Sequence, residues 1–152
     1  MSSAREKLNE LGLELPPVVA PVAAYVPAVQ TGNLVYVSGQ VPIADGQLLA
    51  SGKVGAEVST EHAIDLARTC ALNALAAIDG LVGLERVVKV VKLLGFVASA
   101  PGFNEQPKVI NGASELFGAV FGEAGQHARS AVGVAELPIN APVEVEVVVE
   151  IA

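Results

Sequence analysis

The residue with the clearest potential for chemistry is Arg129, which lies near the end of the chain in the segment HARSAVGVAELP. The alternation of a β-strand places every second residue on one face, and those that follow Arg129 are small. They are Ala131, Gly133 and Ala135. A guanidinium with room beside it can bind a planar carboxylate through two parallel, charge-assisted hydrogen bonds. Arg129 is therefore our candidate for binding an anionic substrate.

Glu144, Glu146 and Glu150 lie in the closing segment VEVEVVVEI, on the face opposite the alternating valines. A carboxylate such as that of Glu144 could act as a general base toward water, which typically contributes about 10²–10⁴-fold to a rate. The proline-bearing loop 137–142 reverses the chain between the two strands. We therefore expect Arg129 and Glu144 to lie about six residues, or ~20 Å, apart along the strands. One site could use both only if they come from different subunits.

Each assignment has a structural alternative. Arg129 could form an interface ion pair with Glu146 or Glu150, and Glu144 could be one of several solvated strand carboxylates. His127 shares a strand face with Arg129, but it lies far along the chain from His62, with no cysteine or carboxylate at ligand spacing. We therefore predict ordinary surface or hydrogen-bonded histidines and no metal site.

Composition limits the partners. The chain has 152 residues, of which 52% are apolar and 16% are charged, against roughly 25% charged in an average soluble domain. A surface so poor in charge predicts a homo-oligomer. The net charge of −7 argues against nucleic-acid binding, and the absence of glycine-rich phosphate motifs argues against a nucleotide cofactor.

The compartment is also suggested by the sequence. A single cysteine, Cys70, lies within a helical apolar stripe, so we expect a buried, inert thiol and no internal disulfide. We find no signal peptide and no apolar run long enough to span a membrane. The sequence thus predicts a cytoplasmic protein that acts on a small molecule without a cofactor and without membrane association.

The remaining segments provide the elements that position these residues. A capping box predicts a short helix over 3–11, and prolines predict an extended arm up to residue 21. Apolar residues at helical spacing predict helices at about 60–79 and 106–121. Strands are expected at 22–29, 34–43, 86–98, in the two closing segments and, as a short edge strand, within 47–58. In the second of these strands, Ser38-Gly39-Gln40 indicates a bulge or a close backbone approach.

These elements predict an α+β fold: a single mixed six-stranded sheet with two helices packed on one face, plus a short N-terminal helix and an extended arm. We expect one domain over 1–152, with the arm at 1–21 and the core at 22–152.

Three segments together resemble the RidA family, also called YjgF/YER057c, which has a chorismate-mutase-like fold. They are AYVPAVQTGNLVYVSGQVP, PKVINGASELF and ARSAVGVAELPINAPVEVE. The resemblance covers about Tyr25 to the C-terminus. The last segment is specific, because it fixes several residue types over some eighteen positions, whereas SGQVP alone is weak. The long arm and the long 44–60 connection resemble the branch whose members are often labelled endoribonucleases.

The resemblance implies a homotrimer with ligand sites in the clefts between subunits. It implies hydrolytic deamination of reactive 2-imino acids and enamines to 2-keto acids and ammonia, without a cofactor. The family's carboxylate-binding arginine falls on Arg129, and the glutamate that orients the attacking water falls on Glu144.

Other family positions also have counterparts. The cleft tyrosine falls on Tyr25, the backbone contact on Ser38 and Gly39, and the helix asparagine on Asn111. Tyr25 could instead serve packing, and Asn111 could make surface hydrogen bonds. The position two after the arginine is often cysteine in the family and is Ala131 here, so no thiol assists at that point.

Two other functions remain open at this stage. A non-catalytic trimeric module that binds small carboxylates or a partner protein would use the same Arg129 face. An endoribonuclease is disfavoured by the net negative charge and by the lack of a basic patch.

Overall fold

The computed structural model describes residues 2–21 and 23–152. Its helices are α1 (Ala4–Glu10), α2 (Thr60–Val82) and α3 (Gln106–Phe121). Its strands are β1 (Ala28–Thr31), β2 (Leu34–Gln40), β3 (Ile43–Ala44), β4 (Gln47–Leu48), β5 (Val87–Ala98), β6 (Ala128–Val134) and β7 (Val143–Ile151). Short 3₁₀ turns lie at Leu84–Arg86, Gly122–Gly125 and Pro138–Asn140.

The main sheet has five strands in the order β1-β2-β7-β5-β6, and β3 pairs with β4 in a separate two-stranded sheet. All neighbours are antiparallel except β5 and β6, which are parallel. The α+β class and the mixed sheet agree with the sequence prediction. The single six-stranded sheet was wrong, because the segment after β2 folds back on itself around Asp45-Gly46 and does not join the main sheet.

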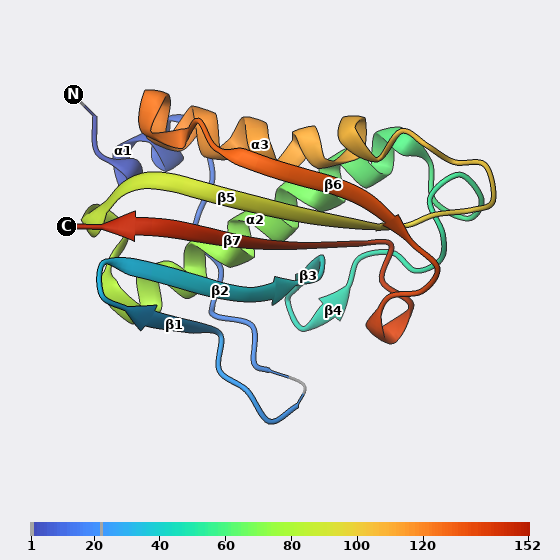
Figure 1. The fold of residues 1–152 in the computed structure, drawn as a ribbon, viewed down its shortest axis with the longest axis horizontal. Coiled ribbons are helices and arrows are strands. Elements are labelled where there is room, and N and C mark those ends of the chain that lie inside the picture. Colours follow the sequence, from blue (N-terminus) through green and yellow to red (C-terminus); the bar gives the residue numbers. More distant parts are fainter. Residues whose placement is uncertain (1, 22) are drawn as a thin grey trace.

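Both long helices cover the same face of the main sheet (Figure 1). The alternating valines of β7 are buried beneath them, and the intervening residues lie on the other face. Val143, Val145, Val147 and Val149 are each at most 1% exposed. Period-two alternation thus gives β7 one apolar face for the core and one acidic face away from the helices.

Helix α2 begins where Ser59 accepts a hydrogen bond from the His62 backbone N–H, which is an N-cap of the preferred kind. It continues through Gly80 and ends before Gly83, whose φ of 90° an L side chain rarely adopts. Helix α3 has the predicted bounds, with Pro107 in its first turn, where the missing N–H costs nothing.

The two helices cross at Gly112. A Cβ placed there would lie 2.0 Å from the Ile64 carbonyl oxygen of α2. The backbones therefore approach more closely than any other residue would permit. This contact sets the position of α3, and with it the residues that α3 presents to β6.

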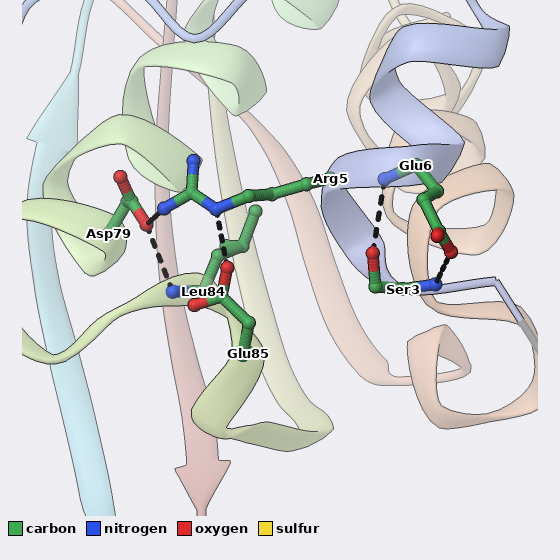
Figure 2. A network of polar contacts seen from close by, with 6 residues as sticks. All are labelled: Ser3, Arg5, Glu6, Asp79, Leu84 and Glu85. Carbon is green, nitrogen blue, oxygen red and sulfur yellow. Dashed lines mark hydrogen bonds and ion pairs between the residues drawn. The ribbon is translucent and has the colours of Figure 1, made fainter.

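The N-terminal helix α1 contacts the C-terminal end of α2 and the turn that follows it (Figure 2). Ser3 and Glu6 form the predicted capping box. Arg5 forms ion pairs with Asp79, near the end of α2, and with Glu85 in the turn that follows. Asp79 also accepts the Leu84 backbone N–H at 3.0 Å. One arginine therefore connects α1 to the turn that leads into β5.

The arm that follows has no regular secondary structure in the described residues between Leu11 and Pro27. A Cβ at Gly80 would lie 3.1 Å from Val18 Cγ2, so the arm runs close against α2. The predicted strand at 22–29 was largely wrong, since β1 begins at Ala28, directly after Pro27. Pro27 has no N–H to donate to a ladder. Val22 lies outside the described residues.

Candidate active site

Arg129 lies on β6, the edge strand next to α3, and its guanidinium is held by that helix. Nη1 donates to Asn111 Oδ1 at 2.9 Å and to Ser114 Oγ at 3.0 Å, and Nη2 donates to the Pro107 carbonyl at 3.0 Å. All three acceptors belong to the first three turns of α3. Asn111, which the sequence left between a pocket role and a surface role, contacts the arginine directly.

The guanidinium retains donors for a ligand. An arginine has five N–H groups, and the three bonds above leave the Nε–H and one hydrogen on Nη2 without a partner in the described chain. Among the residues that the structure describes (2–21 and 23–152), no ion pair involves Arg129. Within one protomer, the alternative pairing with Glu146 or Glu150 is therefore not formed, and Ala131 lies partly buried against the core beyond the arginine.

The sheet register places Arg129 and Glu144 on opposite faces. Arg129 pairs with Leu93 of β5, and Glu144 pairs with Phe96 of the same strand. Paired residues share a face, and residues three apart on one strand do not. The two residues are separated by three positions along β5, about 10 Å, and by two strand spacings, also about 10 Å. The expected offset of six residues was too large, because the register on β5 places Glu144 level with Val132, only three residues from Arg129.

Glu144 lies at a bulge in the neighbouring strand β2. Val37 pairs with Val147 and Gln40 with Val145, so an extra residue is accommodated at Ser38-Gly39, as the sequence predicted. A Cβ on Gly39 would lie 2.7 Å from Glu144 Oε1. The bulge and the absence of a side chain therefore make space for the carboxylate.

A cavity of about 70 Å³ opens beside this carboxylate. Its walls come from the arm (Val19, Ala20, Pro21), from the segment around Tyr25 and Pro27, from β2 and β3, and from the Pro138-Ile139 turn. Most of these side chains are apolar. Burial raises the pKa of Glu144, and the negative charge of Glu146 raises this pKa further. A carboxyl group in such surroundings accepts and returns a proton more readily near neutral pH than an exposed one.

The structure divides the predicted site residues into two groups. Tyr25, Gly39 and Glu144 line one cavity, whereas Arg129, Asn111 and Ala131 lie together at the β6–α3 edge. Tyr25 lies in a bend before β1, not on a strand, and is 46% exposed.

Ser38 belongs to neither group. Its hydroxyl donates to the Val26 carbonyl at 2.6 Å, and it does not line the Glu144 cavity. This bond ties β2 to the bend that carries Tyr25. The Ser38 side chain therefore supports the cavity that Tyr25, Gly39 and Glu144 line, but it is not itself part of the cavity wall.

Two residues that sequence reasoning did not assign to the site contact Arg129 directly or through one hydroxyl. Ser114 Oγ accepts from Arg129 and lies 2.8 Å from His127 Nε2. His127 Nδ1 lies 2.6 Å from the Gly125 carbonyl oxygen. The shared strand face of His127 and Arg129 was the available signal, but Ser114 comes from a helix whose position the sequence alone does not give.

Cys70 is fully buried, as predicted, and burial raises the pKa of its thiol, with a smaller effect of Glu144 in the same direction. This thiol is therefore not a nucleophile. Among the described helices, none is both long enough and apolar enough to cross a membrane.

The mixed sheet, with two helices on one face and a small hairpin beside it, defines an α+β protein of the chorismate-mutase-like kind. The family model described as "YjgF/chorismate_mutase-like, putative endoribonuclease" matches residues 5–151. The chain therefore belongs to the YjgF/RidA family, and the resemblance seen in the sequence is confirmed.

Three individual proteins illustrate this membership. Protein TCP17 of Trypanosoma cruzi is 46% identical over 146 residues, covering 95% of this chain and 91% of that protein. A 2-iminobutanoate/2-iminopropanoate deaminase of Dermatophagoides farinae is 35% identical over 131 residues, covering 86% and 88%. The crystal structure of a protein from Shewanella oneidensis titled a "putative endoribonuclease" is 32% identical, with a TM-score of 0.96 over 99% of this chain and all of that chain.

Proposed function

We propose that this chain hydrolyses 2-imino acids and their enamine tautomers to 2-keto acids and ammonia, at sites formed between the subunits of a homotrimer. The observation that carries the proposal is the division of the site. Arg129 has an Nε–H and one Nη2–H without a partner in the described chain, and Glu144 lines an apolar cavity. The two residues lie on opposite faces of the sheet. A second copy that brings its β6–α3 edge to the Glu144 cavity completes one site.

In this site Arg129 binds the carboxylate of the substrate. Its unused Nε–H and Nη2–H match two carboxylate oxygens, and the guanidinium is already oriented by Asn111, Ser114 and the Pro107 carbonyl. Ala131 leaves space beside the bound group. An oriented cation contributes to both binding and positioning of the reacting carbon.

Glu144 of the other copy acts on water. Its carboxylate removes a proton as the water oxygen bonds to the imine carbon, and the C=N π electrons move to nitrogen. Glu144 then returns the proton to the nitrogen, which gives a carbinolamine with one hydroxyl and one amino group. In the last step Glu144 takes the hydroxyl proton and passes it to the nitrogen, so that the C–N bond breaks, the C=O bond forms and ammonia leaves. The raised pKa of Glu144 suits a group that both accepts and donates this proton. Tyr25 and the Gly39 backbone bound the cavity.

The name of the Dermatophagoides relative supports the same reaction class. The endoribonuclease label receives less support from the chemistry. Polynucleotide binding requires clustered lysines and arginines, whereas the net charge is −7 and the described walls of the Glu144 cavity include neither residue type.

The test is an assay of ammonia release from 2-imino acids generated in situ by an amino-acid oxidase. The wild-type protein should accelerate imine decay, and Arg129→Gln and Glu144→Gln should each remove the acceleration. Binding of 2-keto acids without acceleration would indicate a carboxylate-binding module instead. Cleavage of RNA that is lost in Glu144→Gln would overturn the proposal in favour of a nuclease.

A further inference from the structure

The side chains of Arg129, Ser114 and His127 form a short hydrogen-bonded chain that ends on a backbone carbonyl. The distances are 3.0 Å from Arg129 Nη1 to Ser114 Oγ, 2.8 Å from Ser114 Oγ to His127 Nε2, and 2.6 Å from His127 Nδ1 to the Gly125 oxygen. Two ends of this chain have fixed polarity. A guanidinium can only donate, and a carbonyl oxygen can only accept.

When the His127 ring is neutral, these fixed ends determine the position of every proton between them. His127 Nδ1 must carry a hydrogen to reach Gly125, so in the neutral ring Nε2 is bare and accepts the Ser114 O–H. The Ser114 oxygen then keeps its lone pairs for the Arg129 Nη1–H. Each donor and each acceptor has one compatible partner, so the arrangement favours a single orientation of the guanidinium.

The surroundings hold the histidine in place. Its ring packs edge-on against Phe117 of α3, with centroids 6.1 Å apart at 89°. Gly125 is buried, and a Cβ there would lie 2.4 Å from the Phe117 carbonyl oxygen. The Gly125 carbonyl is therefore held close to α3, and α3 also carries Ser114.

We propose that Ser114 and His127 are positioning residues for Arg129: neutral His127, protonated at Nδ1, takes the Ser114 proton and so reserves the serine oxygen for the guanidinium that binds the substrate carboxylate. This inference rests on the carboxylate-binding role proposed for Arg129. It predicts that the bond from His127 to Ser114 matters for ligand binding, and that the bond to Gly125 matters for stability.

Two substitutions at the same position separate these bonds. The amide oxygen of glutamine can occupy the place of Nε2, so His127→Gln retains an acceptor for Ser114. The amide nitrogen of asparagine can occupy the place of Nδ1, so His127→Asn retains the donor to Gly125 and loses the contact with Ser114. Ser114→Ala removes the connection from the other side.

The first measurement needs no ligand. ¹⁵N NMR of the full-length protein reads the His127 tautomer, and ¹⁵N relaxation of the Arg129 Nε–H reads the order of the guanidinium. We expect an Nδ1-protonated His127 ring in wild type and an ordered Arg129 Nε–H in both wild type and His127→Gln, with increased motion of this Nε–H in His127→Asn and Ser114→Ala. An Nε2-protonated ring, or equal order in all four proteins, overturns the inference even if the proposed function holds.

The second measurement uses pyruvate as the probe, by calorimetry, with imine hydrolysis kinetics in parallel. We expect Kd and KM to rise about three- to tenfold in His127→Asn and Ser114→Ala, the effect of one lost hydrogen bond, with kcat changed less. His127→Gln should remain near wild type. If pyruvate binding is impaired in His127→Gln and not in His127→Asn, only the bond from His127 to Gly125 matters, and the inference fails. If Arg129→Gln binds pyruvate as wild type does, the proposed function fails. The NMR result still decides whether Ser114 and His127 position the Arg129 guanidinium.

Discussion

At the scale of single residues, the environment of Glu144 differs from that of an ordinary strand carboxylate. The side chain lies at a bulge, beside an apolar cavity, two positions from Glu146 on the same face. Burial and the neighbouring charge both oppose ionisation and raise its pKa. The raised pKa of Glu144 therefore affects the pH dependence of both the rate and the stability.

The pH dependence of the rate follows from this pKa. Glu144 must be ionised to accept a proton from water, so kcat/KM should rise with pH through a pKa above the usual glutamate value of about 4.3. Glu146→Gln removes a negative charge that raises this pKa, so the acid limb should move to lower pH. Steady-state kinetics across pH measure both. A limb that stays in place in Glu146→Gln would show that Glu144 is not the titrating base.

Stability should change in the opposite sense. The folded protein holds a proton on Glu144 at pH values where the unfolded chain has released it, so this group favours the folded state at low pH. That contribution is lost as pH rises through the window between the unfolded and the folded pKa. Glu144→Gln should therefore be more stable relative to wild type at pH 7 than at pH 3. Urea unfolding at the two values tests this, and an equal difference at both would contradict it.

Gly39 provides the space that the carboxylate occupies. In Gly39→Ala the new Cβ would contact the end of the Glu144 side chain, which can move aside. We expect imine hydrolysis to fall at least tenfold, on the order of a general-base loss, with little change in the urea midpoint. Gly118→Ala, where a Cβ meets nothing within 4 Å, is the matched control and should keep full activity. Full activity in Gly39→Ala would remove Glu144 from the proposed chemistry.

The sequence identified candidate site residues, but it did not identify the residues that hydrogen-bond to them. Arg129 was identified by its type and by strand alternation, and Glu144 was chosen among three glutamates on one face through the family resemblance. The bonds from Arg129 to Asn111 and Ser114 depend on where α3 lies over β6, and the sequence does not give this placement. Strand periodicity relates residues on one element, and it gives no register between elements.

At the scale of elements, the crossing of α2 and α3 depends on Gly112. Gly112→Ala places a methyl group against the Ile64 carbonyl, which is backbone and cannot move aside. We expect a loss of about 1–3 kcal/mol or more in the free energy of unfolding, measured by urea denaturation. Gly118→Ala in the same helix should instead be neutral or stabilising by up to about 1 kcal/mol. Equal effects of the two substitutions would mean that the crossing tolerates a side chain.

The helices were predicted well and the sheet less well, for a physical reason. Helix α2 has an N-cap at Ser59, helix α3 has Pro107 in its first turn, and both helices have apolar stripes, so their bounds are local properties. The strand expected at 22–29 and the six-stranded sheet were wrong because strand pairing is decided by distant partners. Residues 43–48 have strand character but pair with each other.

At the scale of the whole molecule, the proposal requires two copies for each site. Arg129→Gln and Glu144→Gln should each be inactive alone. Mixed by co-expression in equal amounts, they should regain about a quarter of wild-type activity, because in a closed ring one seam in four joins an intact arginine to an intact glutamate.

The matched control is a mixture of Arg129→Gln with the double variant Arg129→Gln/Glu144→Gln. This mixture has no intact arginine and should stay inactive. Absence of recovery in the first mixture, with mixed oligomers verified by mass spectrometry, would place both groups in one protomer and contradict the split site.

The sheet order has a further consequence for synthesis. Strand β7, which pairs with both β2 and β5, comes last of the described strands along the chain. While the ribosome is still producing residues 143–151, the β1–β2 hairpin and the β5–β6 pair each present an open ladder with no central strand between them. Assembly must therefore wait until translation of this segment is finished, and nascent chains stalled before it should depend on chaperones to avoid aggregation.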